Sequence, residues 1–284
     1  MSKKDTLVAM IYDFDKTLCD RDMQEYSFIP NLGMNPKEFW KATAEFTNKE
    51  RMDKILACMY MMLSETEKDG KHITKEYLNS LGNDINFFPG IINWFERINE
   101  YGRNHGLRIE HYIVSSGLKE IIEGTKISKY FKEIYACEFL YNENGYAIWP
   151  KMSVNYTTKT QFLSRINKGV LDISDDKSLN RKMLDEDRRI STKNMIYFGD
   201  GLTDIPSMRM AREGGGYAIA VYQNDDKKIA EDLLKDNRID FYAKADYQDG
   251  SEIDFLVKNI LEHISIKYKL NSIHKEQMNE IKEN

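Results

Sequence analysis

The sequence lacks the features that mark disulfide-rich, zinc-binding and nucleic-acid-binding proteins. It contains only three cysteines, Cys19, Cys58 and Cys137, which lie far apart and form no C-x-x-C pair. Such a scattered, odd-numbered set argues against a disulfide framework or a zinc site and fits a reducing compartment. Lysine and arginine number 41 against 46 acidic residues, a formal net charge of −5. The chain therefore has no basic field for nucleic acid or an anionic membrane surface.

Long apolar runs are absent as well. Only six apolar residues, Leu7 to Tyr12, precede Asp13 near the N-terminus, and a signal peptide needs a longer stretch. The longest apolar run, Ile55 to Leu63, is about half of what a membrane span requires. We therefore expect a cytoplasmic protein that does not enter a membrane.

What is present indicates an α/β protein. With 284 residues, 41% of them hydrophobic, the chain can bury a core in one large domain or two smaller ones. Short apolar runs separated by helical patterns predict the buried strands of a parallel, Rossmann-like sheet. The predicted strands are Leu7–Tyr12, Ile109–Val114, Ile134–Leu140, Met195–Phe198 and Tyr217–Val221. Ligands of such sheets bind beyond the carboxyl ends of the strands.

One stretch interrupts the alternation of strands and helices. Residues 19–87 show only helical patterns. The alternation of strands and helices resumes after Phe88-Pro89-Gly90, which predicts a turn. The simplest interpretation is a small helical domain inserted after the first strand. Residues 1–18 and 88–265 would then form the α/β core.

Composition predicts the structure of three further segments. Residues 141–146 predict a turn between two short extended pieces. Residues 167–193 are very polar and predict a solvated helical excursion, and residues 266–284 form a charged C-terminal tail.

The first candidate site lies where the first predicted strand ends. In Tyr12-Asp13-Phe14-Asp15-Lys16-Thr17, Asp13 and Asp15 point to the same side if the extended geometry persists. Neighbouring carboxylates repel each other, and the arrangement suits a hard divalent cation or a nucleophile beside an acid/base. A capped loop at a strand end is the structural alternative.

A second acidic pair follows the fourth predicted strand. Gly199 and Gly201 flank Asp200 and permit a tight turn with close backbone approach. Asp204, two residues before Pro206, is also explained as the N-cap of a helix. No such structural role explains Asp200, a bare carboxylate at the end of an apolar strand.

Two polar segments lie between these pairs. Ser115, Ser116 and Gly117 follow the second predicted strand, where hydroxyl and backbone N–H groups can bind an anion. A plain serine N-cap explains them equally well. Lys159 begins another helical pattern, and a lone lysine there is ordinarily a solvated surface residue.

The order of these segments carries more information than any one of them. D-x-D-x-T, S-S-G after a strand, a lysine and G-D-G-x-x-D together resemble the four motifs of the haloacid dehalogenase (HAD) superfamily. The resemblance covers roughly residues 7–20 and 88–222. The insertion at residues 19–87 resembles a C1-type helical cap, and D-F-D-K-T-L resembles the phosphoserine-phosphatase-like branch. The implied fold is a HAD-like α/β core with a small inserted cap domain.

The resemblance implies a phosphomonoesterase that acts on a small phosphorylated metabolite through an aspartyl phosphate on Asp13. Asp15 would protonate the leaving alcohol and then activate the hydrolytic water. The phosphoryl oxygens would be bound by Ser115, Ser116, Gly117 and Lys159.

The same resemblance implies a Mg²⁺ site. Its ligands would be a carboxylate oxygen of Asp13, the backbone carbonyl of Asp15, and Asp200. Asp204 would orient a metal-bound water or Lys159.

In the phosphoserine-phosphatase-like branch, an acidic residue after the first motif holds the amino group of the substrate. A cap arginine holds its carboxylate. Asp22 and Glu25 are the acidic candidates in this sequence, and Arg51 is the candidate arginine.

Two other classes of protein stay open at this point. A phosphoacceptor signalling module also combines an acidic metal site, a hydroxyl and a lysine, and a catalytically silent phosphate-binding protein needs similar groups. A residue like Asp15 and a cap favour turnover over signalling. The phosphoryl group could also pass to another alcohol instead of water. The sequence determines neither the substrate nor the oligomeric state.

Overall fold

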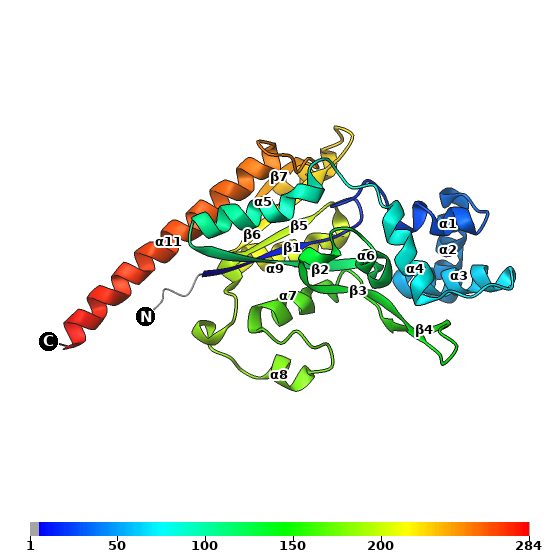
Figure 1. The fold of residues 1–284 in the computed structure, drawn as a ribbon, viewed down its shortest axis with the longest axis horizontal. Helices are drawn as coiled ribbons and strands as arrows, with labels where there is room; N and C mark the ends of the chain where they lie inside the picture. Colours follow the sequence, from blue (N-terminus) through cyan, green and yellow to red (C-terminus); the bar gives the residue numbers. More distant parts are fainter. Residues whose placement is uncertain (1–5, 284) are drawn as a thin grey trace.

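The computed structural model describes residues 6–283 and contains a seven-stranded sheet with helices on both faces (Figure 1). The strand order is β4-β3-β2-β1-β5-β6-β7, and every neighbouring pair is parallel except β3 and β4. The strands are β1 (Thr6–Tyr12), β2 (Leu107–Leu118), β3 (Phe131–Tyr141), β4 (Ala147–Met152), β5 (Met195–Gly199), β6 (Tyr217–Tyr222) and β7 (Phe241–Lys244). The predicted α/β class with a parallel sheet is confirmed.

All five predicted strands are present, and the predicted turn at residues 141–146 joins β3 to β4 as a hairpin. Strand β7 was not predicted. It is only four residues long, and just one of them, Ala243, is buried. So short an edge strand has no apolar run that a sequence pattern can detect.

The helices that cover the sheet alternate with its strands. Helices α5 and α11 contact each other on one face, and α7 and α9 contact each other on the other face (Figure 1). The helices are α1 (Phe28–Asn31), α2 (Pro36–Glu50), α3 (Lys54–Lys68), α4 (Lys75–Leu81), α5 (Ile91–Asn104), α6 (Lys119–Glu123), α7 (Lys159–Lys168), α8 (Asp176–Asn180), α9 (Ile205–Glu213), α10 (Lys228–Lys235) and α11 (Glu252–Glu283). No helix of the described chain is long and apolar enough to cross a membrane.

The central strand β1 is buried on both sides, and residues Val8 to Tyr12 are inaccessible to solvent. This burial explains why the strand reads as a continuous apolar run instead of an alternating one. Strands β2 and β5 flank β1, so the chain order reverses there. The carboxyl end of β1 is therefore the topological switch point where α/β sheets bind ligands.

Helices α1 to α4 follow β1 and precede α5 along the chain, and they gather at one end of the molecule (Figure 1). Helix α2 begins with a capping box in which Asn35 and Glu38 bond each other's backbone, with proline at its first position. Asp53 accepts hydrogen bonds from two backbone N–H groups at the start of α3. Five apolar residues of α3, from Ala57 to Met62, are buried in a helix that packs on α2 and β4, whereas Tyr60 is 48% exposed. This packing accounts for most of the long apolar run in the sequence.

The polar stretch 167–193 differs from its prediction. It begins with the last two residues of α7, and apart from these and the five residues of α8 it contains only irregular chain and short 3-10 turns. The buried guanidinium of Arg165 donates to the carbonyls of Asp172 and Ile173 and thereby satisfies the backbone of this loop. The segment is therefore an irregular loop fixed by an internal arginine and not a solvated helix.

The C-terminal boundary of the predicted core falls inside a helix. Residues 266–283 continue α11 without a break, and residue 284 lies outside the described residues, as do residues 1–5 of the predicted core. What changes at the boundary is burial, because Ser265 is buried and Ile266 is exposed.

A buried polar network ties β1 to β2 and α5. Trp94 Nε1 donates to the hydroxyl of Tyr12, which lies 3.1 Å from His111 Nδ1, and His111 Nε2 lies 3.1 Å from Asn99 Oδ1. A neutral imidazole that carries its proton on Nε2 satisfies all these atoms. Burial lowers the pKa of His111 to about 3.

This burial predicts acid sensitivity of the fold. Below pH 6.5 the unfolded chain takes up a proton on residue 111, whereas the folded protein does not until the pH approaches 3. The difference in free energy of unfolding between wild type and His111→Gln favours wild type at pH 7. This difference should be smaller by about 2 kcal/mol at pH 5. Urea denaturation at both pH values measures it.

The control for this measurement is His263→Gln. His263 is exposed on α11 and meets water in both states. That variant should leave the pH dependence of stability unchanged. The prediction would be contradicted if wild type and His111→Gln differed by the same free energy of unfolding at pH 7 and pH 5.

Candidate active site

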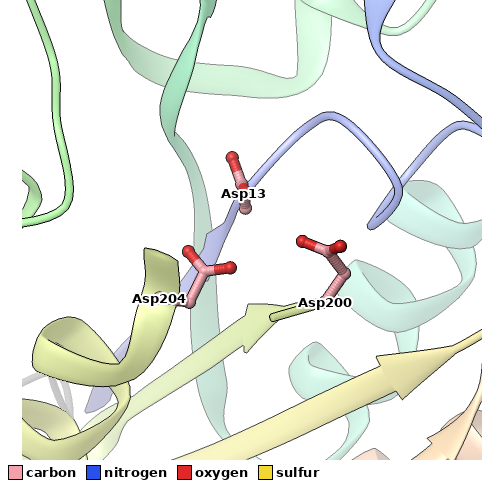
Figure 2. A group of neighbouring side chains, drawn as sticks. All are labelled: Asp13, Asp200 and Asp204. Carbon is pink, nitrogen blue, oxygen red and sulfur yellow. The ribbon is translucent and has the colours of Figure 1, made fainter. Parts of the chain in front are cut away.

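Three aspartates from two strand ends converge at the switch point (Figure 2). Asp13 directly follows β1, Asp200 directly follows β5, and Asp204 precedes helix α9. Each offers a carboxylate oxygen, and these oxygens lie within 4.8 Å of one another. The first and last predicted motifs therefore meet in space.

The carboxylate of Asp15 lies outside this group. Its Oδ1 accepts a hydrogen bond of 2.9 Å from the backbone N–H of Met23, which lies on the segment leading to the helices α1 to α4. Burial raises the pKa of Asp15 well above its ordinary value, and the charges of Asp22 and Asp13 act in the same direction. These surroundings favour the protonated form of this carboxyl group.

Lys159 is completely buried and joins two of the aspartates. Its Nζ lies 3.0 Å from Asp13 Oδ2 and 2.8 Å from Asp204 Oδ1. The alternative of a solvated surface lysine is wrong, because the first turn of α7 points this side chain into the site. Burial alone would lower its pKa, but the charges of Asp13 and Asp204 outweigh burial and raise it.

Asp204 does not act as a helix cap, although it stands at the N-cap position of α9. Its side chain makes no capping hydrogen bond. Its Oδ1 instead accepts from Lys159 Nζ and, at 2.7 Å, from the hydroxyl of Tyr197. Tyr197 was not recognised in the sequence, since a tyrosine in an apolar strand reads as core. The capping explanation of Asp204 is therefore wrong.

The electrostatics of the site indicate a place for a cation. Burial raises the pKa of Asp13 to about 6, helped by Asp204 and opposed by Lys159. Burial also raises the pKa of Asp200 to about 8, with Asp204 and Asp13 adding to the effect. One buried ammonium does not balance three carboxylates, and Asp204 Oδ2 is buried without a hydrogen-bond partner among residues 6–283. A hard divalent cation with oxygen ligands fits this set of donors.

The serine segment occupies the carboxyl end of β2, beside β1. Ser115 is buried, and its Oγ accepts a 3.0 Å hydrogen bond from the N–H of Gly117. The carbonyl of Ser116 accepts from Cys137 Sγ. A Cβ on Gly117 would meet the Cε of Met23 at 2.1 Å, so glycine permits this close approach. These residues still belong to the strand, which excludes the serine N-cap alternative.

The candidates for binding a substrate amino group are engaged within the protein. Asp22 Oδ2 lies 2.6 Å from the Nζ of Lys16, and Glu25 accepts a 2.6 Å hydrogen bond from Trp40 Nε1. Arg51 is exposed at the C-terminal end of α2. Lys16 was not singled out in the sequence, and its backbone is left-handed, at φ 58°.

Gly199 is required by close packing in the site. A Cβ at this position would lie 2.5 Å from the Cγ of Asp204, whereas nothing lies within 4 Å of a Cβ on Gly201. Gly199→Ala should therefore displace Asp204 and lower the free energy of unfolding by about 1–3 kcal/mol, because overpacking shifts the buried side chains around it. Urea denaturation of Gly199→Ala and Gly201→Ala tests this, and equal effects of the two substitutions would contradict it.

Comparison with known proteins identifies the class to which this fold and site belong. The family model of haloacid dehalogenase-like hydrolases matches residues 10–209, which include Asp13, Lys159, Asp200 and Asp204. The chain belongs to this family and is an enzyme of the hydrolase class. The superfamily resemblance read from the motifs is confirmed.

The similar proteins include a relative that matches most of this chain and solved structures that share its fold. An uncharacterized protein of Borreliella burgdorferi is 28% identical over 280 residues, covering 89% of this chain and 96% of that protein. A crystal structure of phosphoserine phosphatase in its apo form superposes with a TM-score of 0.53 at 15% identity, covering 84% of this chain and 93% of that chain. A crystal structure of a HAD family hydrolase from Salmonella enterica subsp. enterica serovar Typhi has a TM-score of 0.53 at 19% identity, covering 75% of this chain and 62% of that chain. The fold is thus shared with the phosphoserine-phosphatase-like branch.

Proposed function

We propose that the protein is a Mg²⁺-dependent phosphomonoesterase that hydrolyses a small phosphorylated metabolite through an aspartyl phosphate on Asp13. The observation that carries the proposal is the buried contact of Lys159 with Asp13 and Asp204, beside Asp200. This arrangement holds one carboxylate ready to attack and supplies positive charge where the phosphoryl oxygens develop negative charge.

In the first step, a carboxylate oxygen of Asp13 attacks phosphorus and the bond to the alcohol oxygen breaks. Asp15 donates its proton to that leaving oxygen. In the second step, Asp15 takes a proton from a water molecule, whose oxygen attacks the phosphorus and releases Asp13 and inorganic phosphate. In both steps the phosphoryl oxygens are bound by Ser115, Ser116, Gly117 and Lys159. For this, the N–H of Gly117 must break its hydrogen bond to Ser115 Oγ.

The proposed Mg²⁺ site comprises one oxygen of Asp13, the backbone carbonyl of Asp15, and Asp200, with Asp204 positioning Lys159. Bound Mg²⁺ would supply positive charge that offsets the negative charge of the carboxylates and of the phosphoryl group. The raised pKa values of Asp13 and Asp200 support this assignment, because burial and the neighbouring carboxylates disfavour charged forms that a bound cation would stabilise.

Residues 19–87 are proposed to act as a cap that closes over the site. Asp13 is only 6% exposed and Lys159 is fully buried, so a substrate reaches them only if covering elements move. The bond from the Met23 N–H to Asp15 links the entry of this segment to the proposed acid. A closing lid favours a ligand small enough to enclose. The three free, buried cysteines support a reducing, cytoplasmic location.

Phosphate release from a panel of small phosphomonoesters tests the function. We expect turnover with Mg²⁺ and a loss of roughly 10³-fold or more with EDTA, restored by excess Mg²⁺. The panel contains phosphoserine, phosphorylated amino alcohols, nucleotides and sugar phosphates, and a second alcohol in the assay detects transfer in place of hydrolysis. A long-lived phosphoprotein without turnover would support a signalling module instead, and binding without reaction would support a silent binder.

A further inference from the structure

Helix α11 extends beyond the body of the protein as a single rod (Figure 1). Its first half packs on the core through buried apolar residues such as Ile253, Val257 and Leu261. From Ile266 to Lys282 every residue except Ser272 is exposed. These residues span about 25 Å at 1.5 Å per residue, and an isolated helix of this length is only marginally stable in water.

The projecting half carries an apolar stripe on the face opposite to the one that packs on the core. Ile266, Leu270 and Ile273 follow the spacing i, i+4, i+7, and Ile281 continues the row after Gln277. These four side chains are 56%, 61%, 51% and 69% exposed. The opposite face is apolar where it meets the core. Here it carries the polar residues Asn271 and Lys275 together with Tyr268 and Met278, which are 38% and 41% exposed. The stripe is thus positioned for a partner other than the body of the same chain.

The charges beside the stripe are divided into two blocks. Residues 266–275 contain three lysines and no acidic residue, whereas residues 276–282 contain two glutamates and one lysine. Acidic side chains near the C-terminal end of a helix oppose its macrodipole, so this order does not stabilise the isolated helix. Along one edge of the stripe Lys269 precedes Glu276 by two turns.

We propose that α11 is a self-association surface, and that two copies of this chain pair through residues 266–281 as an antiparallel helix pair. Rotation about a two-fold axis near Ile273 places the basic block of each copy beside the acidic block of the other. Lys269 then faces Glu276 of the second copy, and Ile266 meets Ile281 of the second copy. A parallel arrangement would place like charges side by side. One surface that carries both complementary blocks is suited to a second copy of itself.

This proposal is independent of the phosphatase function, because the stripe lies on the part of α11 that extends beyond the body (Figure 1) and outside the family match at residues 10–209. Sedimentation equilibrium of the full chain at low ionic strength tests it. We expect a species of twice 33.3 kDa at tens of micromolar protein. Leu270→Asp/Ile273→Asp should raise the dissociation constant roughly 100-fold or more. Phosphate release should stay at the wild-type value, as should the melting temperature at concentrations where wild type is monomeric.

The control for this variant is Ile229→Asp, which changes an isoleucine on α10 that is 49% exposed and lies outside the stripe. It should leave the dimer intact. A wild-type monomer at all concentrations, or a dimer that persists in Leu270→Asp/Ile273→Asp, would overturn the proposal.

Charge reversal tests the antiparallel orientation. Lys269→Glu alone and Glu276→Lys alone should each weaken the dimer about tenfold, because each creates two like-charge contacts across the two-fold axis. The double variant restores both pairs with opposite signs and should return the dissociation constant to within about threefold of wild type. A double variant as weak as the single ones would overturn the antiparallel arrangement.

Discussion

Asp13→Asn is expected to abolish phosphate release, with a loss of roughly 10³-fold or more in kcat, because the amide cannot form the aspartyl phosphate. The fold should persist. Burial and Asp204 raise the pKa of Asp13, so the neutral side chain costs less here than at an ordinary ion pair. We expect a melting temperature within a few degrees of wild type. Parallel assays of phosphate release and thermal unfolding separate loss of chemistry from loss of structure.

The control for this substitution is Asp226→Asn, an exposed aspartate beyond β6. It should retain full activity. Turnover that survives in Asp13→Asn would show that another group accepts the phosphoryl. Mass spectrometry of wild type after brief exposure to substrate should also detect a single added phosphoryl group that is missing in the variant.

Lys159→Met is expected to have the largest effect on stability as well as a strong effect on activity. The substitution leaves the carboxylates of Asp13 and Asp204 buried without their ammonium partner. Removing one member of a buried ion pair costs about 3–5 kcal/mol. The free energy of unfolding in EDTA should fall by that amount, and kcat should fall roughly 10³-fold.

Two comparisons identify the cause of this destabilisation. Lys159→Met/Asp204→Asn removes one of the unpaired charges and should be more stable than Lys159→Met alone. Added Mg²⁺ should stabilise Lys159→Met, since a cation that binds only the folded protein raises its stability. A Lys159→Met protein that unfolds within about 1 kcal/mol of wild type would mean that the contact is not energetically important.

The strands and the acidic motifs could be predicted because their signals are local. The apolar run of β1 ends at Asp13 and that of β5 at Asp200, and parallel strands bring their carboxyl ends to one edge. The order of the motifs then indicated the family. The loop at residues 167–193 was mispredicted because its backbone is satisfied by Arg165, a contact that no local composition reveals.

The sequence by itself determined the class of fold, the family and the residue types of the site, since apolar periodicity and motif spacing follow from the chain alone. Only the tertiary structure decided which alternative held at Lys159 and Asp204. The packing of α7 decides whether the lysine at its start lies on the surface or in the site. Asp204 caps a helix or contacts Lys159 according to what lies opposite its carboxylate. Likewise, Tyr197 becomes part of the site only because β5 places its hydroxyl against Asp204. Contacts between residues distant in the chain depend on how helices and strands pack, and no local sequence pattern specifies that packing.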